Sequence, residues 1–202
     1  MDSQWKETVV VLLPKVNNLD QPSNFRPISL CQTIYKIVAK VLVNRFKGIL
    51  SRIISEEQAV FVQGRSISNH CLLGQELMNK VKVSKEKRGL LALKVDMEQA
   101  YDKMSWRTLE LVLRNMGFPP IFSSWVLNCV TNPKFSILIS GKLSEGILTD
   151  CGFRQGCPLS PYLFILCSEL LSAHFHQNFK ELGVPISRGD LWSLTYYMLT
   201  IF

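Results

Sequence analysis

The hydrophobic and polar positions along the chain first indicate where strands lie. Residues 8–15, TVVVLLPK, form a short apolar run that predicts a strand ended by Pro14. Residues 88–96, RGLLALKVD, are apolar on both faces, as expected for a strand at the centre of a sheet. Residues 134–142 and 144–152 are typical of a hairpin pair around Gly141. The segments NNLDQPSNFRP and RQGCPLSP are rich in turn-forming residues and predict loops.

Helical spacing of apolar residues predicts five helices, over residues 32–54, 70–83, 105–116, 121–130 and 162–182. In the first helix the apolar positions are Ile34, Ile37, Val38, Val41, Leu42, Ile49, Leu50 and Ile53. Strands and helices are mixed, without internal repeats or linkers, so the fold class predicted is α+β.

The charge of the chain is basic and unevenly distributed. The formal net charge is +7, with a pI near 9.2. Up to Val95 there are 15 basic and 7 acidic residues, net +8; from Asp96 onward there are 8 and 9, net −1. This asymmetry suits a polyanion held by one lobe and processed by the other. A lysine-rich solvated surface would explain the charge equally well.

Cysteine, histidine and apolar runs exclude several classes of protein. The six cysteines show no C-x-x-C spacing, so we expect buried thiols without disulfide partners or zinc. His174 and His176 are two residues apart on a predicted helix and do not face one another. The polar start MDSQWKE is no signal peptide, and no apolar run reaches the length of a membrane span. We expect an intracellular protein, nuclear or cytoplasmic and not secreted.

Two acids follow the predicted central strand in LKVDMEQAYDKMSW, residues 93–106. Asp96 stands at the carboxyl end of that strand, where sheets often place active groups. A desolvated carboxylate needs a cation partner, and magnesium prefers one or two carboxylates together with substrate phosphates. Asp102 lies six residues later, beyond a turn. It is better explained as a structural acid, at a helix start or in a salt bridge.

The same segment resembles the first palm motif of reverse transcriptases from LINE-type (non-LTR) retrotransposons, particularly those of plants. Four other segments agree in order: VVLLPK, NFRPISLCQTIYKIVAKVLVNRF, EEQAVFVQGRSI and RQGCPLSPYLF. The resemblance extends from about Trp5 to Gly189. It implies a right-hand polymerase fold, with a basic fingers-like lobe at residues 1–90, a partial palm at 91–202 and no thumb, together one domain fragment of about residues 5–189.

The resemblance also implies roles for individual residues. Asp96 would be the first catalytic, metal-binding aspartate of a two-metal nucleotidyl transfer that uses Mg²⁺. Tyr101 would block the ribose 2′-OH and select deoxynucleotides; the alternative is an ordinary core aromatic. Lys15 and Arg26 would reach the incoming triphosphate, for which a guanidinium is well shaped; outside this family they would be surface cations.

The segment containing Arg154, Gln155 and Gly156 would pack on the nascent base pair, with glycine allowing close backbone approach. The partners implied are an RNA template, a DNA primer and deoxynucleoside triphosphates. The basic first half would hold the template through its phosphates.

The sequence departs from the family after GVPISRG. A Tyr/Phe-Ala-Asp-Asp hairpin is expected there, but the chain reads DLWSLTYYMLTIF, whose only acid is Asp190. A shifted reading frame from Ser193 onward joins the third base of each codon to the first two bases of the next. With permitted codon choices, this frame encodes Ser-His-Leu-Leu-Tyr-Ala-Asp-Asp. We therefore hypothesise a one-base frameshift near Gly189–Trp192 and an inactive fragment. The alternatives are a non-catalytic RNA- or DNA-binding retrotransposon remnant, and a pseudogene product that scarcely folds.

Overall fold

A computed structural model of the chain describes residues 1–85 and 97–178. Its elements form two compact units. Unit 1 consists of residues 1–48 and 99–167, and unit 2 of residues 49–98 and 168–202. Each unit is assembled from two stretches of sequence. The boundary expected near residue 90, between fingers and palm, stays a prediction, and the central strand predicted over residues 88–96 lies outside the described residues.

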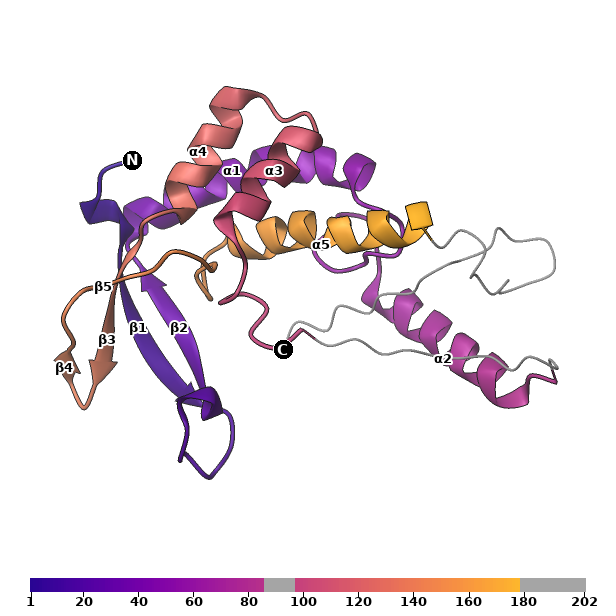
Figure 1. Cartoon of the computed structure of the whole chain (residues 1–202), viewed down its shortest axis with the longest axis horizontal. Coiled ribbons are helices and arrows are strands. Elements are labelled where there is room, and N and C mark those ends of the chain that lie inside the picture. Colours follow the sequence, from indigo (N-terminus) through magenta and orange to yellow (C-terminus); the bar gives the residue numbers. More distant parts are fainter. Residues whose placement is uncertain (86–96, 179–202) are drawn as a thin grey trace. The chain divides into compact units, whose positions relative to one another are not determined.

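Unit 1 contains a five-stranded sheet in the order β2-β1-β3-β4, with β5 also paired to β3. The strands are β1 (Glu7–Pro14), β2 (Phe25–Cys31), β3 (Lys134–Ile139), β4 (Lys142–Leu143) and β5 (Ile147–Leu148). Two short 3₁₀ turns, η1 (Gln4–Lys6) and η2 (Pro22–Asn24), precede β1 and β2. β1 runs antiparallel to β2 and parallel to β3, as Figure 1 shows. The strand predicted over residues 8–15 and the hairpin around Gly141 are confirmed.

The pattern analysis missed β2. This strand contains Pro27, which has no N–H to donate and is normally excluded from central strands. β2 is an edge strand, and the N–H of Ser29, two residues further on, points away from β1 and donates to the Gln155 carbonyl at 2.7 Å. Alternate residues point the same way, so the nitrogen of Pro27 also faces away from β1 and costs no ladder hydrogen bond.

Five helices complete the described chain: α1 (Thr33–Ile53), α2 (Ile67–Val83), α3 (Trp106–Asn115), α4 (Pro120–Val130) and α5 (Ser160–Asn178). All five were predicted, with ends shifted by a few residues; residues 179–182, predicted to end the last helix, lie outside the described part. Local chemistry explains two of the ends. The Ser105 hydroxyl caps α3 by accepting from the Thr108 N–H, and Gly117, with a φ of +75°, follows its last turn.

The buried face of α1 differs from the one that its apolar spacing suggested. Tyr35, Ala39, Leu42, Val43, Phe46 and Leu50 are buried, whereas Ile34, Ile37, Val41 and Ile49 are exposed. The helix is apolar on more than one face, and the larger aromatic side chains decide which face enters the core. Phe46 meets the rings of Phe118 and Phe122 at centroid distances of 5.4 and 5.0 Å, both edge to face.

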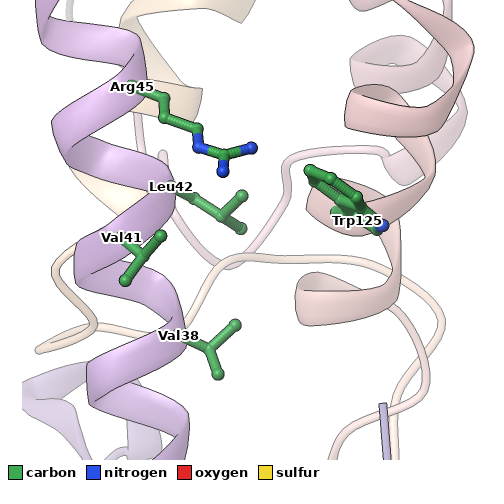
Figure 2. Close-up of a pocket in the computed structure, with 5 residues that line it drawn as sticks. All are labelled: Val38, Val41, Leu42, Arg45 and Trp125. Atoms are coloured by element: carbon green, nitrogen blue, oxygen red, sulfur yellow. The ribbon is translucent and has the colours of Figure 1, made fainter.

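The outward face of α1 forms a shallow apolar groove with α4 in unit 1, shown in Figure 2. Val38, Val41, Leu42 and Arg45 line it from α1, and Trp125 lines it from α4, around a volume of about 270 Å³. The Arg45 guanidinium lies 5.3 Å from the centre of the Trp125 ring, a cation–π contact. None of the residues proposed for chemistry lines this groove.

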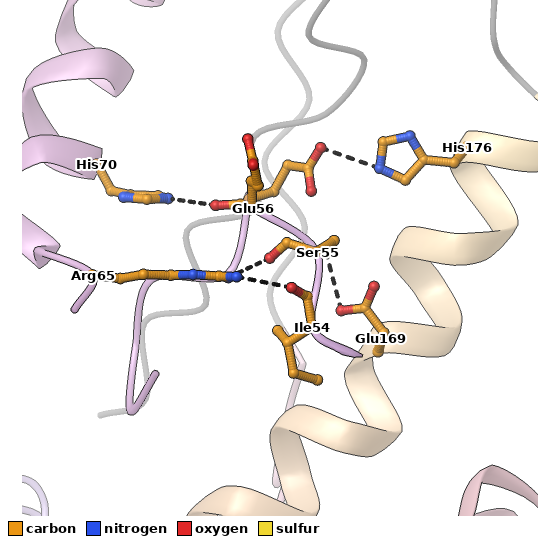
Figure 3. A network of polar contacts seen from close by, with 8 residues as sticks. Ile54, Ser55, Glu56, Arg65, His70, Glu169 and His176 are labelled. Carbon is orange, nitrogen blue, oxygen red and sulfur yellow. Dashed lines mark hydrogen bonds and ion pairs between the residues drawn. The ribbon is translucent and has the colours of Figure 1, made fainter. Parts of the chain in front are cut away.

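In unit 2, Arg65 collects the backbone carbonyls that follow the end of α1 (Figure 3). Its guanidinium donates to the carbonyls of Ile54 at 2.8 Å, Gln58 at 2.6 Å and Ser55. These carbonyls belong to the loop after the helix, and the guanidinium gives them a charged donor where a helix or sheet would supply backbone N–H groups.

A row of polar side chains on α5 faces the same loop. Ser55 donates to the Glu169 carboxylate at 3.0 Å, Gln58 donates to the Ser168 hydroxyl at 3.0 Å, and His176 lies 3.1 Å from the Glu57 carboxylate. Burial raises the pKa of Glu169, while the bonds from Ser55 lower it. Polar contacts therefore join the two stretches of sequence that form unit 2.

All six cysteines are free thiols. Among the described helices, none combines the length and the apolar character needed to cross a membrane.

Replacing Arg65 by methionine should lower the free energy of unfolding by about 2–4 kcal/mol, because three carbonyls lose a charged donor. Arg52→Met, at an exposed arginine in the last turn of α1, is the matched control and should change stability by less than about 0.5 kcal/mol. Urea unfolding followed by circular dichroism measures both. Equal losses would show that the Arg65 contacts contribute nothing specific.

Candidate functional site

The guanidinium of Arg154 lies in the interior of unit 1, with 4% of the residue exposed. It donates to the Thr8 hydroxyl at 3.1 Å, the Tyr35 hydroxyl at 2.9 Å, and the carbonyls of Cys129 and Lys6 at 2.8 and 3.1 Å. It also lies 4.5 Å from the centre of the Tyr35 ring. One side chain thus connects its loop to β1, α1 and α4.

Next to Arg154, the titratable side chains of Tyr35 and Cys129 are neutral, whereas Lys6 is a second cation. Burial raises the pKa of Tyr35 well above its usual range and raises that of Cys129 to about 11. Burial and the Arg154 charge both lower the pKa of Lys6, whose ammonium donates to the Thr131 carbonyl at 3.2 Å. The cation is thus stabilised by oriented neutral acceptors and by the Tyr35 ring.

This geometry gives Arg154 an internal supporting role. Its guanidinium is directed toward protein acceptors, and its predicted role at the nascent base pair stays a prediction. The adjoining residues differ. Gln155 is half-buried and Gly156 is exposed, and for both the predicted role at the nascent base pair stays a prediction.

The loop after Arg154 lies against the outer edge of β2. Besides the 2.7 Å bond from Ser29 to the Gln155 carbonyl, Gly156 approaches the same strand closely. Its φ is +100°, and a Cβ there would lie 3.1 Å from the Ser29 carbonyl oxygen. Glycine is required here both by the backbone conformation and by the space available.

A turn containing Tyr101 and Asp102 is attached to the segment that leads into this loop. The N–H groups of Gly152 and Phe153 donate to the carbonyls of Met104 at 2.8 Å and Tyr101 at 2.7 Å. The Trp106 indole donates to the Gly152 carbonyl at 2.8 Å. These bonds place the turn and the loop in a defined register.

Tyr101 stacks on the buried ring of Phe164 in α5, with centroids 5.2 Å apart and an interplanar angle of 23°. Burial raises its pKa to about 12, so the hydroxyl remains protonated at neutral pH. The ring is half-buried and rigidly supported. This arrangement is compatible with both sequence interpretations, and selection against the ribose 2′-OH stays a prediction.

Asp102 does not stand at a helix start, since Ser105 is the N-cap of α3. Within the described residues its carboxylate has no ion pair; its partner is the amide of Gln155, whose nitrogen lies 3.2 and 3.3 Å from the two carboxylate oxygens. Burial raises the pKa of Asp102, while the Gln155 bond and the nearby charge of Lys15 lower it. The fold therefore brings Asp102 into contact with Gln155, within the influence of the Lys15 charge.

Lys15 and Arg26 are exposed at the end of the β1–β2 hairpin that the connecting loop closes. Arg26 pairs with Leu13, and the Lys15 N–H continues the ladder by donating to the Asn24 carbonyl at 2.8 Å. Opposed and alternate residues share a face, so both cations lie on the same side of the hairpin. The Lys15 ammonium donates to the Ser23 carbonyl at 3.0 Å.

Asp96, the predicted metal ligand, lies outside the described residues. Within residues 1–85 and 97–178, no three His, Cys, Asp or Glu side chains form a group that could hold a metal ion.

Sequence reasoning missed the residues that support this site, namely Lys6, Thr8, Tyr35, Ser29 and Gly152. Lys6 and Thr8 carry no local signal, because they are ordinary polar residues beside an apolar strand. Gly152 could have been noticed as a glycine two residues before Arg154. Its φ is +91°, and a Cβ there would lie 2.7 Å from the Asp102 carbonyl oxygen.

Replacing Arg154 by methionine should cost at least about 3 kcal/mol of unfolding free energy, because buried acceptors on three elements lose their donor. Arg107→Met, at an exposed position of α3, is the matched control and should be nearly neutral. Chemical denaturation measures both variants. A nearly neutral Arg154→Met would contradict the supporting role.

Replacing Gly152 by alanine should destabilise the chain more than replacing Gly117 by alanine. Both glycines have positive φ, and alanine there costs about 1–2 kcal/mol. Only Gly152→Ala adds a clash with backbone, since nothing lies within 4 Å of a Cβ at Gly117. Thermal unfolding compares the two, and an equal loss would show that the turn gives way easily.

Comparison with known proteins places the chain in a family. Residues 13–197 match the family described as reverse transcriptase (RNA-dependent DNA polymerase). The chain is 32% identical, over 81% of its length, to the transposon TX1 uncharacterized 149 kDa protein of Xenopus laevis. It is 23% identical over 90% of its length to the Pol polyprotein of the type-1 retrotransposable element R2 of Popillia japonica, and 24% identical over 80% to a probable RNA-directed DNA polymerase from transposon BS of Drosophila melanogaster.

The chain spans only 12%, 26% and 18% of the length of these three relatives. Among solved structures it resembles apo telomerase from Candida tropicalis, with a TM-score of 0.54 and 15% identity, over 89% of this chain and 41% of that one. The mixed helix-and-sheet fold expected from the sequence is confirmed by this likeness. By the match over residues 13–197, the chain belongs to the reverse transcriptase (RNA-dependent DNA polymerase) family, and its relatives come from retrotransposable elements.

Proposed function

We propose that this chain forms the nucleotide-facing part of an RNA-directed DNA polymerase from a LINE-type (non-LTR) retrotransposon. Its substrates are an RNA template, a DNA primer and deoxynucleoside triphosphates, and its location is intracellular, nuclear or cytoplasmic. The observation that carries the proposal is the contact between Asp102 and Gln155, which come from two separate family motifs.

The individual roles follow from exposure and chemistry. Lys15 and Arg26 are exposed cations on one side of a hairpin and can donate to phosphate oxygens. Tyr101 is a supported flat ring, able to exclude a hydroxyl from the sugar position. Gly156 is exposed, so a base pair can approach its backbone.

Magnesium bound by Asp96 would supply positive charge for phosphoryl transfer in the intact family. The described residues offer no further ligand group, and after Gly183 the only acid in the sequence is Asp190. We propose that this chain alone binds the ion weakly and does not extend a primer.

A non-catalytic nucleic-acid-binding remnant is the second candidate, and the composition of α1 favours it. Residues 33–53 contain five Lys or Arg and no acid. Such a helix can hold phosphates without any catalytic step.

The two candidates are separated by measurements on the full chain. Binding of a primed RNA template should weaken at least roughly tenfold between 50 and 200 mM salt if several phosphates are neutralised. Under the first proposal, the complementary deoxynucleotide should tighten this binding in magnesium buffer. The double variant Lys15→Ala/Arg26→Ala should abolish that effect. The control Lys142→Ala, at an exposed lysine of β4, should leave it unchanged.

Under the second candidate, salt-sensitive binding would remain without any nucleotide effect. Primer extension by this chain would refute the proposed inactivity. Binding that does not respond to salt would refute both functions.

A further inference from the structure

The contact between Asp102 and Gln155 joins two segments that the family motifs supply separately. Asp102 lies in a turn within the first palm motif, and Gln155 lies in the loop before α5. The Gln155 amide nitrogen is 3.2 Å from one carboxylate oxygen of Asp102 and 3.3 Å from the other. An ionised carboxylate only accepts hydrogen bonds, so the amide must present its nitrogen to Asp102 and its oxygen away from it.

Backbone contacts hold both partners in place. The Asp102 N–H donates to the Gln99 carbonyl at 2.9 Å, and the Asp102 carbonyl accepts from the Cys151 thiol at 3.5 Å. The Gln155 carbonyl accepts from Ser29 on β2 at 2.7 Å. Neither segment can move far. Because the amide nitrogen of Gln155 faces Asp102, the amide oxygen is the group that Gln155 can present to a ligand.

The surroundings leave Gln155 as the main partner of this carboxylate. Asp102 is half-buried, and within the described residues no cation lies within ion-pair distance. Lys15 influences it through its charge. A half-buried carboxylate loses hydration, whereas an apolar residue could fill the same space without that cost. Packing alone therefore does not explain an acid at this position.

We propose that Asp102 is a positioning residue, which orients the Gln155 amide so that its carbonyl oxygen is offered as a hydrogen-bond acceptor to the incoming nucleotide. This inference rests on the proposed function. The ligand group recognised is a hydroxyl or amino donor of that nucleotide. Asp102 itself does not touch the substrate.

Asp102→Asn tests orientation with little change of shape. The asparagine amide can either accept from or donate to Gln155, so a hydrogen bond survives while the polarity is no longer imposed. Glu145→Gln, between β4 and β5, removes one negative charge from an exposed side chain and is the matched control.

The first measurement is solvent exchange of the Gln155 side-chain amide by NMR on the full chain, with Gln155→Met identifying the signal. Exchange should become roughly tenfold faster in Asp102→Asn and stay unchanged in Glu145→Gln, as expected when a charged acceptor is lost. An unchanged Gln155 signal in Asp102→Asn would overturn the proposal.

The second measurement is the tightening of primed-template binding by complementary dTTP, with non-complementary dATP as reference. Asp102→Asn should reduce the dTTP effect roughly two- to tenfold, which is the change in affinity expected when one hydrogen bond is lost. Gln155→Met should cause a similar loss, and the double variant should lose no more than either single one, because both act through one amide.

The two measurements separate the possible failures. If dTTP has no effect on the unaltered chain, the nucleotide-binding function fails, and amide exchange alone decides the Asp102–Gln155 orientation. If exchange changes but dTTP acts equally on Asp102→Asn and the unaltered chain, orientation toward a nucleotide is refuted. Should Asp102→Asn not fold, Gln155→Met alone retains the test: an undiminished dTTP effect there refutes the proposal.

Discussion

The buried guanidinium of Arg154 is the interaction on which the arrangement of unit 1 depends. A cation in the interior is tolerated only when oriented acceptors surround it, and here they come from β1, from Tyr35 on α1 and from Cys129 on α4. Satisfying all of them determines where the loop after Phe153 runs. The positions of Gln155 against Asp102, and of Gly156 against β2, follow from that path.

The candidate site is therefore built from inside outward. Arg154 fixes the loop, Gly152 lets the neighbouring turn approach it closely, and Phe164 supports the ring of Tyr101. What remains exposed at the surface is a small set of polar groups with defined directions.

An arginine that donates to several acceptors also stabilises unit 2. Arg65 gathers the carbonyls after α1, as Arg154 gathers acceptors within unit 1. Two of the cations that make the chain basic, the buried Arg154 and the half-buried Arg65, thus bind acceptors of the protein itself. The net charge of +7 overstates the charge available for nucleic acid, whereas α1, with five basic residues and no acid, retains an outward cationic surface.

The sequence by itself determined the helices, the strand β1, the hairpin around Gly141 and the family, because these depend on local spacing and on short motifs. It did not reveal β2, since only edge placement makes Pro27 acceptable in a strand. The role of Arg154 was decided by tertiary structure alone. Its acceptors lie between 25 and 148 residues away in the sequence, and burial of a cation is a property of those assembled neighbours. The contact between Asp102 and Gln155 depends on the same long-range assembly.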